Sequence, residues 1–236
     1  MSNYRAVLIA VAMLLLASSA QASIVFDDFN TNEGHFNQNP TFSSTSNVAS
    51  TSTADRITTG TFEGLGSERV VGVQSTVASA RLRFVSGNGT PSNNISFTTS
   101  AGTDGFIGYY AKTSTTGISF AMYLDDSTGA TAGTVGALPK AAIADGQWHL
   151  YEWDLDNAAQ WGVISGSGIA GAAVVSNDSH TIDSLWIQGI TSGATVDYDF
   201  VAKSDSGTIA NLVPEPTMMS LLLPAALAGF SRRRRR

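Results

Sequence analysis

Cysteine is absent from this chain of 236 residues. The absence excludes a disulfide framework, a thiol nucleophile and cysteine ligands for a metal. Histidine is scarce as well, and His35, His149 and His180 show no spacing that is typical of a metal site. The sequence also has no G-x-S-x-G, H-E-x-x-H, phosphate-loop or EF-hand pattern. These absences argue against an enzyme.

Basic residues are few between the two ends of the chain. Six of the 13 lie in the terminal segments, at Arg5 and Arg232 to Arg236, whereas only Glu215 of the 19 acidic residues lies there. The segment 23–212 therefore keeps 7 basic and 18 acidic residues, which is a net charge near −11. So acidic a surface repels phosphate backbones and argues against nucleic acid as a partner. It suits calcium, neutral sugars or solubility alone.

The N-terminal segment has the pattern of a secretory signal peptide. Arg5 is followed by an apolar run from Ala6 to Ala17, and small residues stand at Ala20 and Ala22. A basic start, a short apolar run and an A-x-A site predict cleavage after Ala22, so the mature chain begins at Ser23. The alternative is an uncleaved membrane anchor, for which the run is short.

The C-terminal segment 213–236 combines three parts in order. Pro214, Glu215 and Pro216 come first, an apolar stretch from Thr217 to Phe230 follows, and five arginines end the chain. As a helix, the apolar stretch would be about 21 Å long, which is shorter than the ~30 Å hydrocarbon core of a membrane. The arginines would stay on the cytoplasmic side of an inner membrane.

Together, the Pro-Glu-Pro motif, the short apolar helix and the arginine cluster resemble the PEP-CTERM sorting signal of Gram-negative bacteria. The resemblance implies transient attachment to the inner membrane and cleavage near the motif by an exosortase-type membrane protease. The protein would then be released to the cell surface or to the outside. Members of this family are often tied to exopolysaccharide and biofilm production. The alternative is an ordinary C-terminal anchor, which would usually be longer.

Short alternating stretches fill the region 23–212 and predict an all-β domain. Apolar and polar residues alternate at 81–84, 118–124 and 196–200. Such alternation buries one face of a strand and leaves the other wet, as in an antiparallel sandwich. Glycine-containing turns such as Asp145-Gly146 separate the stretches. We predict one antiparallel jelly-roll β-sandwich over 23–212, with a signal helix in 1–22 and a short apolar helix in 213–236.

Acidic residues lie inside the first and last predicted strands, at Asp27, Asp28, Asp197 and Asp199. Buried carboxylates are costly unless something compensates them, and a hard cation such as Ca²⁺ can do so. The pattern resembles the galactose-binding-like jelly rolls of many carbohydrate-binding modules. The resemblance implies a structural calcium that bridges the two strands through these residues. The alternative is that the carboxylates point to solvent.

The segment from Asp145 to Leu155 also resembles those modules, because a turn is followed by a Trp-His pair and an alternating strand. Concanavalin-like sandwiches share this feature. Glu152, Asp154 and Asp156 lie on one face of the strand, with neighbours about 7 Å apart. Glycosidases catalyse hydrolysis with a pair of carboxyl groups. The stretch is similar to the Glu-x-Asp-x-Glu strand of one concanavalin-like glycosidase family, although the third residue here is Asp156, whose side chain is one methylene shorter than that of glutamate. We expect a solvated strand face, and an enzyme that cleaves glycans with Glu152 and Asp154 is the alternative.

The tryptophans divide between two roles. Aromatic rings stack on sugars, but most fill cores. Trp148 and Trp186 lie within predicted strands, and we assign them to the core. Trp161 lies in a loop-like setting between Gln160 and Gly162, so we predict that it is an exposed, ligand-binding platform.

These patterns favour a non-catalytic, exported surface or matrix protein whose jelly roll binds polysaccharide. A purely structural or adhesive surface protein without a sugar site is the alternative. An exposed aromatic platform favours the first function, and a smooth polar surface favours the second.

Overall fold

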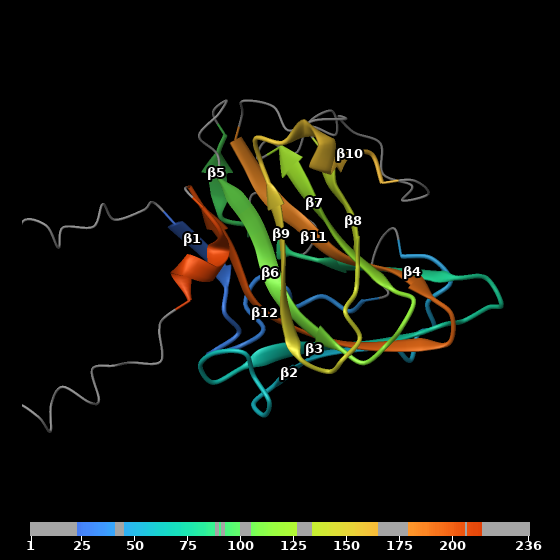
Figure 1. Ribbon diagram of the computed structural model, residues 1–236. Helices are drawn as coiled ribbons and strands as arrows, with labels where there is room; N and C mark the ends of the chain where they lie inside the picture. The colour runs from blue at the N-terminus through green and yellow to red at the C-terminus, as the bar shows by residue number, and fades with distance from the viewer. Residues whose placement is uncertain are drawn as a thin grey trace, which may run out of the picture.

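Two packed sheets make up the folded part of the chain (Figure 1). The computed structural model describes residues 23–40, 45–87, 90, 93–99, 105–126, 134–164, 179–205 and 207–213. Within these residues each sheet has six strands, and every pair of neighbouring strands is antiparallel. The predicted all-β antiparallel sandwich is therefore confirmed, whereas the jelly-roll wiring stays a prediction.

The strands of each sheet come from distant parts of the chain. Sheet A has the order β2 (Thr53–Ile57), β3 (Ser67–Val73), β12 (Gly193–Ser204), β6 (Phe106–Thr113), β9 (Trp148–Asp154), and β1 (Ser23–Asp27) also pairs with β12. Sheet B has the order β10 (Trp161–Gly162), β8 (Val135–Ala141), β7 (Ser119–Asp126), β11 (Ser179–Ile190), β4 (Ala80–Val85), and β5 (Ser96–Thr98) also pairs with β11. Two short 3-10 helices complete the described part, η4 (Ala158–Gln160) and η5 (Ile209–Leu212).

The main hydrophobic core lies between the sheets and follows the alternation in the sequence. In β4, Leu82 and Phe84 are fully buried, while Arg81 and Arg83 occupy the opposite face. In β11, Leu185 and Ile187 enter the same core. Alternate residues of a strand point to opposite faces, so the apolar half of each stretch turns inward.

Strand β12 departs from the alternation at one point. Val196 and Tyr198 enter the main core as expected, but Phe200 packs on the opposite face against Ala202 and Ile209. The pairing register with β6 shifts between Asp199 and Ala202, and Phe200 has a φ of 49°. A bulge of this kind reverses the direction of the following side chains. The prediction that Phe200 shares a face with Tyr198 is therefore wrong.

Trp161 is buried and does not form an exposed platform. It belongs to strand β10, where it pairs with Ala137 of β8, and only 3% of its surface is accessible. Its indole Nε1 donates to the carbonyl of Asp154 at 2.7 Å. The prediction of an exposed Trp161 is wrong, because the 3-10 turn at 158–160 returns the chain to the edge of sheet B and into the core.

Replacing Trp161 should therefore damage the fold. We expect Trp161→Ala to lower the free energy of unfolding by about 3–5 kcal/mol, because a large buried side chain is lost. Val163→Ala is the matched control, since Val163 lies two residues away but is exposed; it should change stability by less than ~0.5 kcal/mol. Chemical denaturation of both variants tests this, and equal stabilities would contradict the burial.

The two tryptophans assigned to the core behave differently from each other. Trp186 is fully buried, as predicted, but on the outer face of sheet B with Ala121, Tyr123 and Ile164. Trp148 is only half-buried, on the outer face of sheet A. Its assignment to the core is wrong, because its position in β9 is out of phase with the inward-facing Tyr151 and Trp153.

A carboxyl group lies buried inside sheet A without a hydrogen-bond partner. Glu68 of β3 is 0% exposed, and neither of its carboxyl oxygens accepts or donates a hydrogen bond. It pairs in register with Arg56 on one side and Tyr198 on the other. Burial is the main cause that raises the pKa of Glu68 to about 9, and the acidic neighbours Glu33, Asp55 and Asp27 add to it. Glu68 is therefore protonated in the folded protein near neutral pH.

This burial gives the domain a specific pH dependence. The unfolded chain ionises Glu68 near its ordinary pKa of 4.5 and the folded chain near 9. Stability from this group is therefore present below pH 4.5 and is lost as the pH rises toward 9. In the wild type, ionisation of Glu68 should lower the free energy of unfolding by roughly 1 kcal/mol per pH unit between pH 7 and 8.5. Glu68→Gln cannot ionise, so this decrease should be absent from the variant. Denaturation curves at both pH values measure the free energies of unfolding. Equal changes of this free energy in wild type and variant would contradict the prediction.

Candidate functional site

A row of four side chains crosses the outer face of sheet A. Asp197 of β12 pairs in register with Arg69 of β3 and with Lys112 of β6, and Lys112 pairs with Trp148 of β9. Directly opposed residues on neighbouring strands present their side chains on the same face, a few ångströms apart. The sheet thus places one carboxylate, two cations and an indole ring side by side.

The row is held together by charge. Nε of Arg69 donates to Oδ1 of Asp197 at 2.7 Å and Nη2 donates to Oδ2 at 2.9 Å, which is the bidentate geometry of a strong ion pair. Nζ of Lys112 lies 3.0 Å from Oδ2 of the same carboxylate. The hydrogen bonds to Asp197 raise the pKa of Arg69. Asp197 is almost completely buried, so its charge is compensated by these two cations instead of by solvent.

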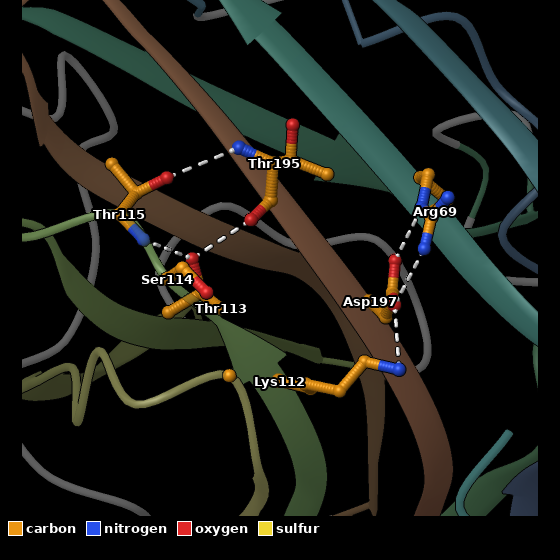
Figure 2. A pocket seen from close by; sticks show the side chains of 8 residues that line it. Arg69, Lys112, Thr113, Ser114, Thr115, Thr195 and Asp197 are labelled. Atoms are coloured by element: carbon orange, nitrogen blue, oxygen red, sulfur yellow. Dashed lines mark hydrogen bonds and ion pairs between the residues drawn. The ribbon is translucent and has the colours of Figure 1, made fainter. Parts of the chain in front are cut away.

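Three residues of the row, Arg69, Lys112 and Asp197, line a pocket of about 360 Å³, shown in Figure 2. One wall comes from the row itself, and the other comes from the turn that follows β6. There Thr113 Oγ1 donates to the carbonyl of Thr195 at 2.7 Å, and Thr115 Oγ1 accepts from the amide of Thr195 at 3.3 Å. The complete lining is Arg69, Lys112, Thr113, Ser114, Thr115, Gly146, Thr195 and Asp197. Seven of these eight residues carry a hydroxyl group or a charge, and the backbone of Thr195 fixes two of the hydroxyls.

Trp148 lies next to the pocket, where its ring covers Lys112. The Nζ of Lys112 lies 4.7 Å from the centroid of the indole, a cation–π contact. The indole Nε1 and the Lys112 Nζ both donate to the carbonyl of Gly60, at 3.2 and 2.6 Å. The ring of Phe62 stacks on Tyr110 at 3.7 Å and approaches Trp148 at 5.9 Å. The loop that carries Gly60 and Phe62 therefore lies across the sheet.

Asp199 fixes this loop to the sheet. Its Oδ2 accepts hydrogen bonds from the amides of Phe62 at 3.0 Å and Glu63 at 3.3 Å, and from the hydroxyl of Ser67 at 2.9 Å. Burial is the main cause that raises the pKa of Asp199 to about 6, while these donors act in the opposite direction. The last strand thus uses Asp197 to build the pocket and Asp199 to hold the adjacent loop.

The four carboxylates predicted to hold calcium do not meet. Asp197 is bound by Arg69 and Lys112, and Asp199 accepts hydrogen bonds from the loop amides and from Ser67. Asp27 lies elsewhere and accepts from the amides of Phe29 at 3.1 Å and His35 at 2.6 Å. Asp28 accepts from the amide of Asn30. No group of three or more acidic, histidine or cysteine side chains in the described part of the chain could hold a metal.

Arg56 occupies the main-chain oxygens that follow the first strand. Its guanidinium donates to the carbonyls of Phe29 at 2.5 Å, Asn30 at 2.6 Å and Leu65 at 3.1 Å. An internal cation therefore ties the end of β1 to the loop before β3, a connection that a bridging calcium could also make. Asp27, Asp28, Asp197 and Asp199 do not come together in the described residues as a group of side chains that could hold a metal, and calcium binding stays a prediction.

The carboxylates of β9 serve structural contacts. Oε2 of Glu152 accepts from the hydroxyl of Thr208 and the amide of Ile209, both at 2.9 Å, and so anchors η5 on sheet A. Asp154 Oδ1 accepts from the amide of Asp156 at 2.9 Å, in the turn that ends the strand. Neither residue lines the 360 Å³ pocket. Their use in glycan cleavage therefore receives no support from the geometry.

The terminal segments fall outside the described residues. This applies to the cleavage-site residues Ala20 and Ala22 and to the sorting motif Pro214, Glu215 and Pro216. In the part of the chain that the structure describes, no helix has the length and apolar character needed to span a membrane.

Sequence reasoning missed Arg69, Lys112 and the hydroxyls of the turn after β6. Alternation places Arg69 and Lys112 each on a polar strand face, but it does not say which strands are neighbours. Only the order β3-β12-β6-β9 brings them to Asp197 and Trp148. The signal present in the sequence was Asp197, an acidic residue within an apolar strand that needed a compensating charge.

Comparison with known proteins shows a likeness to carbohydrate-binding-module β-sandwiches. The family 11 module of the cellulosomal cellulase Lic26A-Cel5E of Clostridium thermocellum matches with 12% identity, a TM-score of 0.47, and coverage of 80% of this chain and 98% of that chain. The CBM22-1 xylan-binding domain of Paenibacillus barcinonensis Xyn10C matches with 11% identity, a TM-score of 0.38, and coverage of 80% and 100%.

A structure of carbohydrate-binding modules from the β-sandwich superfamily matches with 11% identity and a TM-score of 0.43, and covers 78% of this chain. The match spans 63% of the length of that structure. At such identities the likeness concerns the fold alone. No family model matches the chain, and no curated protein matches its sequence.

Proposed function

We propose that the domain is a non-catalytic module of an exported surface or matrix protein and that it binds a saccharide at the pocket beside Trp148. The observation that carries the proposal is the row on sheet A, because Arg69, Asp197 and Lys112 line a pocket of about 360 Å³ and Trp148 lies beside it against Lys112. Ligand pockets of this kind commonly measure about 300–1,000 Å³.

The chemistry of the pocket suits a sugar. A sugar presents hydroxyl groups around its rim and C–H groups on its faces, so it needs hydrogen-bonding partners beside an apolar plate. Arg69 and the hydroxyls of Ser114 and Thr115 offer the former, and the partly exposed indole of Trp148 beside the pocket offers the latter. The ion pairs on Asp197 fix the row before a ligand arrives, which lowers the entropic cost of binding.

Trp148 should contribute to affinity more than to the fold. We expect Trp148→Ala to weaken binding to the best ligand of a polysaccharide and oligosaccharide screen by about 10-fold or more, which corresponds to ~1.4 kcal/mol. The loss of an aromatic plate at the edge of the pocket is the physical reason. Calorimetric titration of wild type and variant measures the change.

Two controls separate binding from folding in this experiment. Val163→Ala changes an exposed side chain of the β10 region, away from the pocket, and should leave affinity unchanged. The thermal transition of Trp148→Ala should stay cooperative. Wild-type affinity in Trp148→Ala would remove this ring from the site, and a wild type that binds no saccharide would favour a purely structural or adhesive protein.

Export and sorting belong to the same proposal, and they are supported by the sequence of the two ends. We expect cleavage after Ala22, transient attachment to the inner membrane, and removal of the tail near Pro214, Glu215 and Pro216 by an exosortase-type protease. The product is a cell-surface or extracellular protein, a setting in which polysaccharide is abundant.

Processing of the tail can be read directly from mass. Intact-mass analysis of the protein recovered outside the cells should give a chain that starts at Ser23 and lacks Arg232 to Arg236. Replacing these five arginines with serine should reduce processing, since they hold the tail on the cytoplasmic side. An extracellular protein that still ends at Arg236 would exclude removal of the tail.

A further inference from the structure

The pocket carries positive charge on a domain that is otherwise acidic. Among its lining residues, Arg69 and Lys112 are cations and Asp197 is the one anion, which leaves a formal charge of +1. The segment 23–212 has only 7 basic residues against 18 acidic ones, so two of its few cations meet here. Asp55 lies opposite Arg69 on β2, but it neither lines the pocket nor forms an ion pair with Arg69.

Arg69 is the charged group that a ligand can reach. Its side chain is 42% exposed, whereas the side chain of Asp197 is 3% exposed and that of Lys112 is 20% exposed. Lys112 is also occupied by Asp197, by the carbonyl of Gly60 and by the ring of Trp148. The exposed charge of the pocket is therefore that of the guanidinium.

The guanidinium keeps donors available after it has bound Asp197. Its Nε and Nη2 make the two bonds to the carboxylate, which use two of the five N–H groups of an arginine. The side that carries Nη1 remains for a second acceptor. A planar fork of this kind pairs well with a carboxylate, and Asp197 already holds it in place on its other side.

From this geometry we propose that the pocket recognises an acidic sugar, with the carboxylate of a uronic-acid residue bound by Arg69. The inference rests on the proposed saccharide-binding function and names its ligand class. The hydroxyls of Ser114 and Thr115 lie on the opposite wall, where they meet the ring hydroxyls of the same sugar. The acidic remainder of the domain is screened beyond about 8 Å at physiological ionic strength, so a short oligomer meets mainly the local charge.

The test compares two ligands that differ only in the acid group. Trigalacturonate and the neutral galactotriose of the same linkage are titrated into the full chain at physiological ionic strength. We expect trigalacturonate to bind at least about 10-fold more tightly, and Arg69→Gln to abolish this preference by weakening trigalacturonate far more than the neutral sugar. Arg69→Lys keeps the charge and should retain part of the preference.

The matched control is another arginine–aspartate pair on the outer face of the other sheet. Arg83 binds Asp183 on sheet B, so Arg83→Gln removes the same charge and the same kind of ion pair without touching the pocket. It should leave the preference for trigalacturonate unchanged. Thermal melting of both variants checks that they remain folded.

The outcomes separate recognition of an acidic sugar from saccharide binding in general. Equal or tighter binding of the neutral trisaccharide overturns the acidic-sugar inference and leaves saccharide binding in place. Wild-type preference in Arg69→Gln, or loss of preference in Arg83→Gln, also overturns the role of Arg69. If the wild type binds neither trisaccharide, the uronate inference fails, and failure in a broad saccharide screen as well removes the proposed function.

Discussion

Two buried carboxylates on β12 organise the outer face of sheet A. Asp197 and Asp199 are 2% and 0% exposed, although they lie on the face that alternation assigns to solvent. An ionised carboxylate that loses its water must find cations or N–H and O–H donors in exchange. Asp197 finds Arg69 and Lys112, and Asp199 finds the amides of the loop before β3 together with Ser67.

The contacts of Asp197 and those of Asp199 depend on one another through the loop that contains Gly60 and Phe62. Asp199 holds the backbone of the loop at Phe62 and Glu63, and the carbonyl of Gly60 then accepts from both Lys112 and Trp148. Lys112 in turn binds Asp197. The orientation of the indole beside the pocket is therefore coupled to a carboxylate one row further along the sheet. Such a network is worth more than its separate bonds when every member is satisfied.

Two other ionisable residues of the sandwich, Glu68 and Arg56, are not part of a carboxylate–cation pair. Glu68 has no partner for its carboxyl oxygens, so burial keeps it protonated instead of paired. Arg56 donates to the main-chain carbonyls of Phe29 and Asn30 after β1, and to that of Leu65 before β3. Gly34, with a φ of 56°, stands so close to the Asp27 carboxylate that a Cβ would lie 1.9 Å from its Oδ2, and this close approach lets the amide of His35 reach Asp27. The end of the first strand is thus fixed by hydrogen bonds from its own loop and from Arg56.

The sequence by itself determined the class of fold and the character of the faces. Period-two alternation at 81–84 and 118–124 placed Leu82, Phe84 and Phe120 in the core, because the side-chain period of a strand depends only on local geometry. The acidic pair on β12 indicated that charge would be compensated there. Tertiary structure alone decided which groups compensate these carboxylates, since the order of strands in a sheet depends on contacts between residues that are distant in sequence. Hence Asp197 received two cations, Arg69 and Lys112, Trp161 was buried by pairing with β8, and Trp148 was left beside a pocket on the outer face.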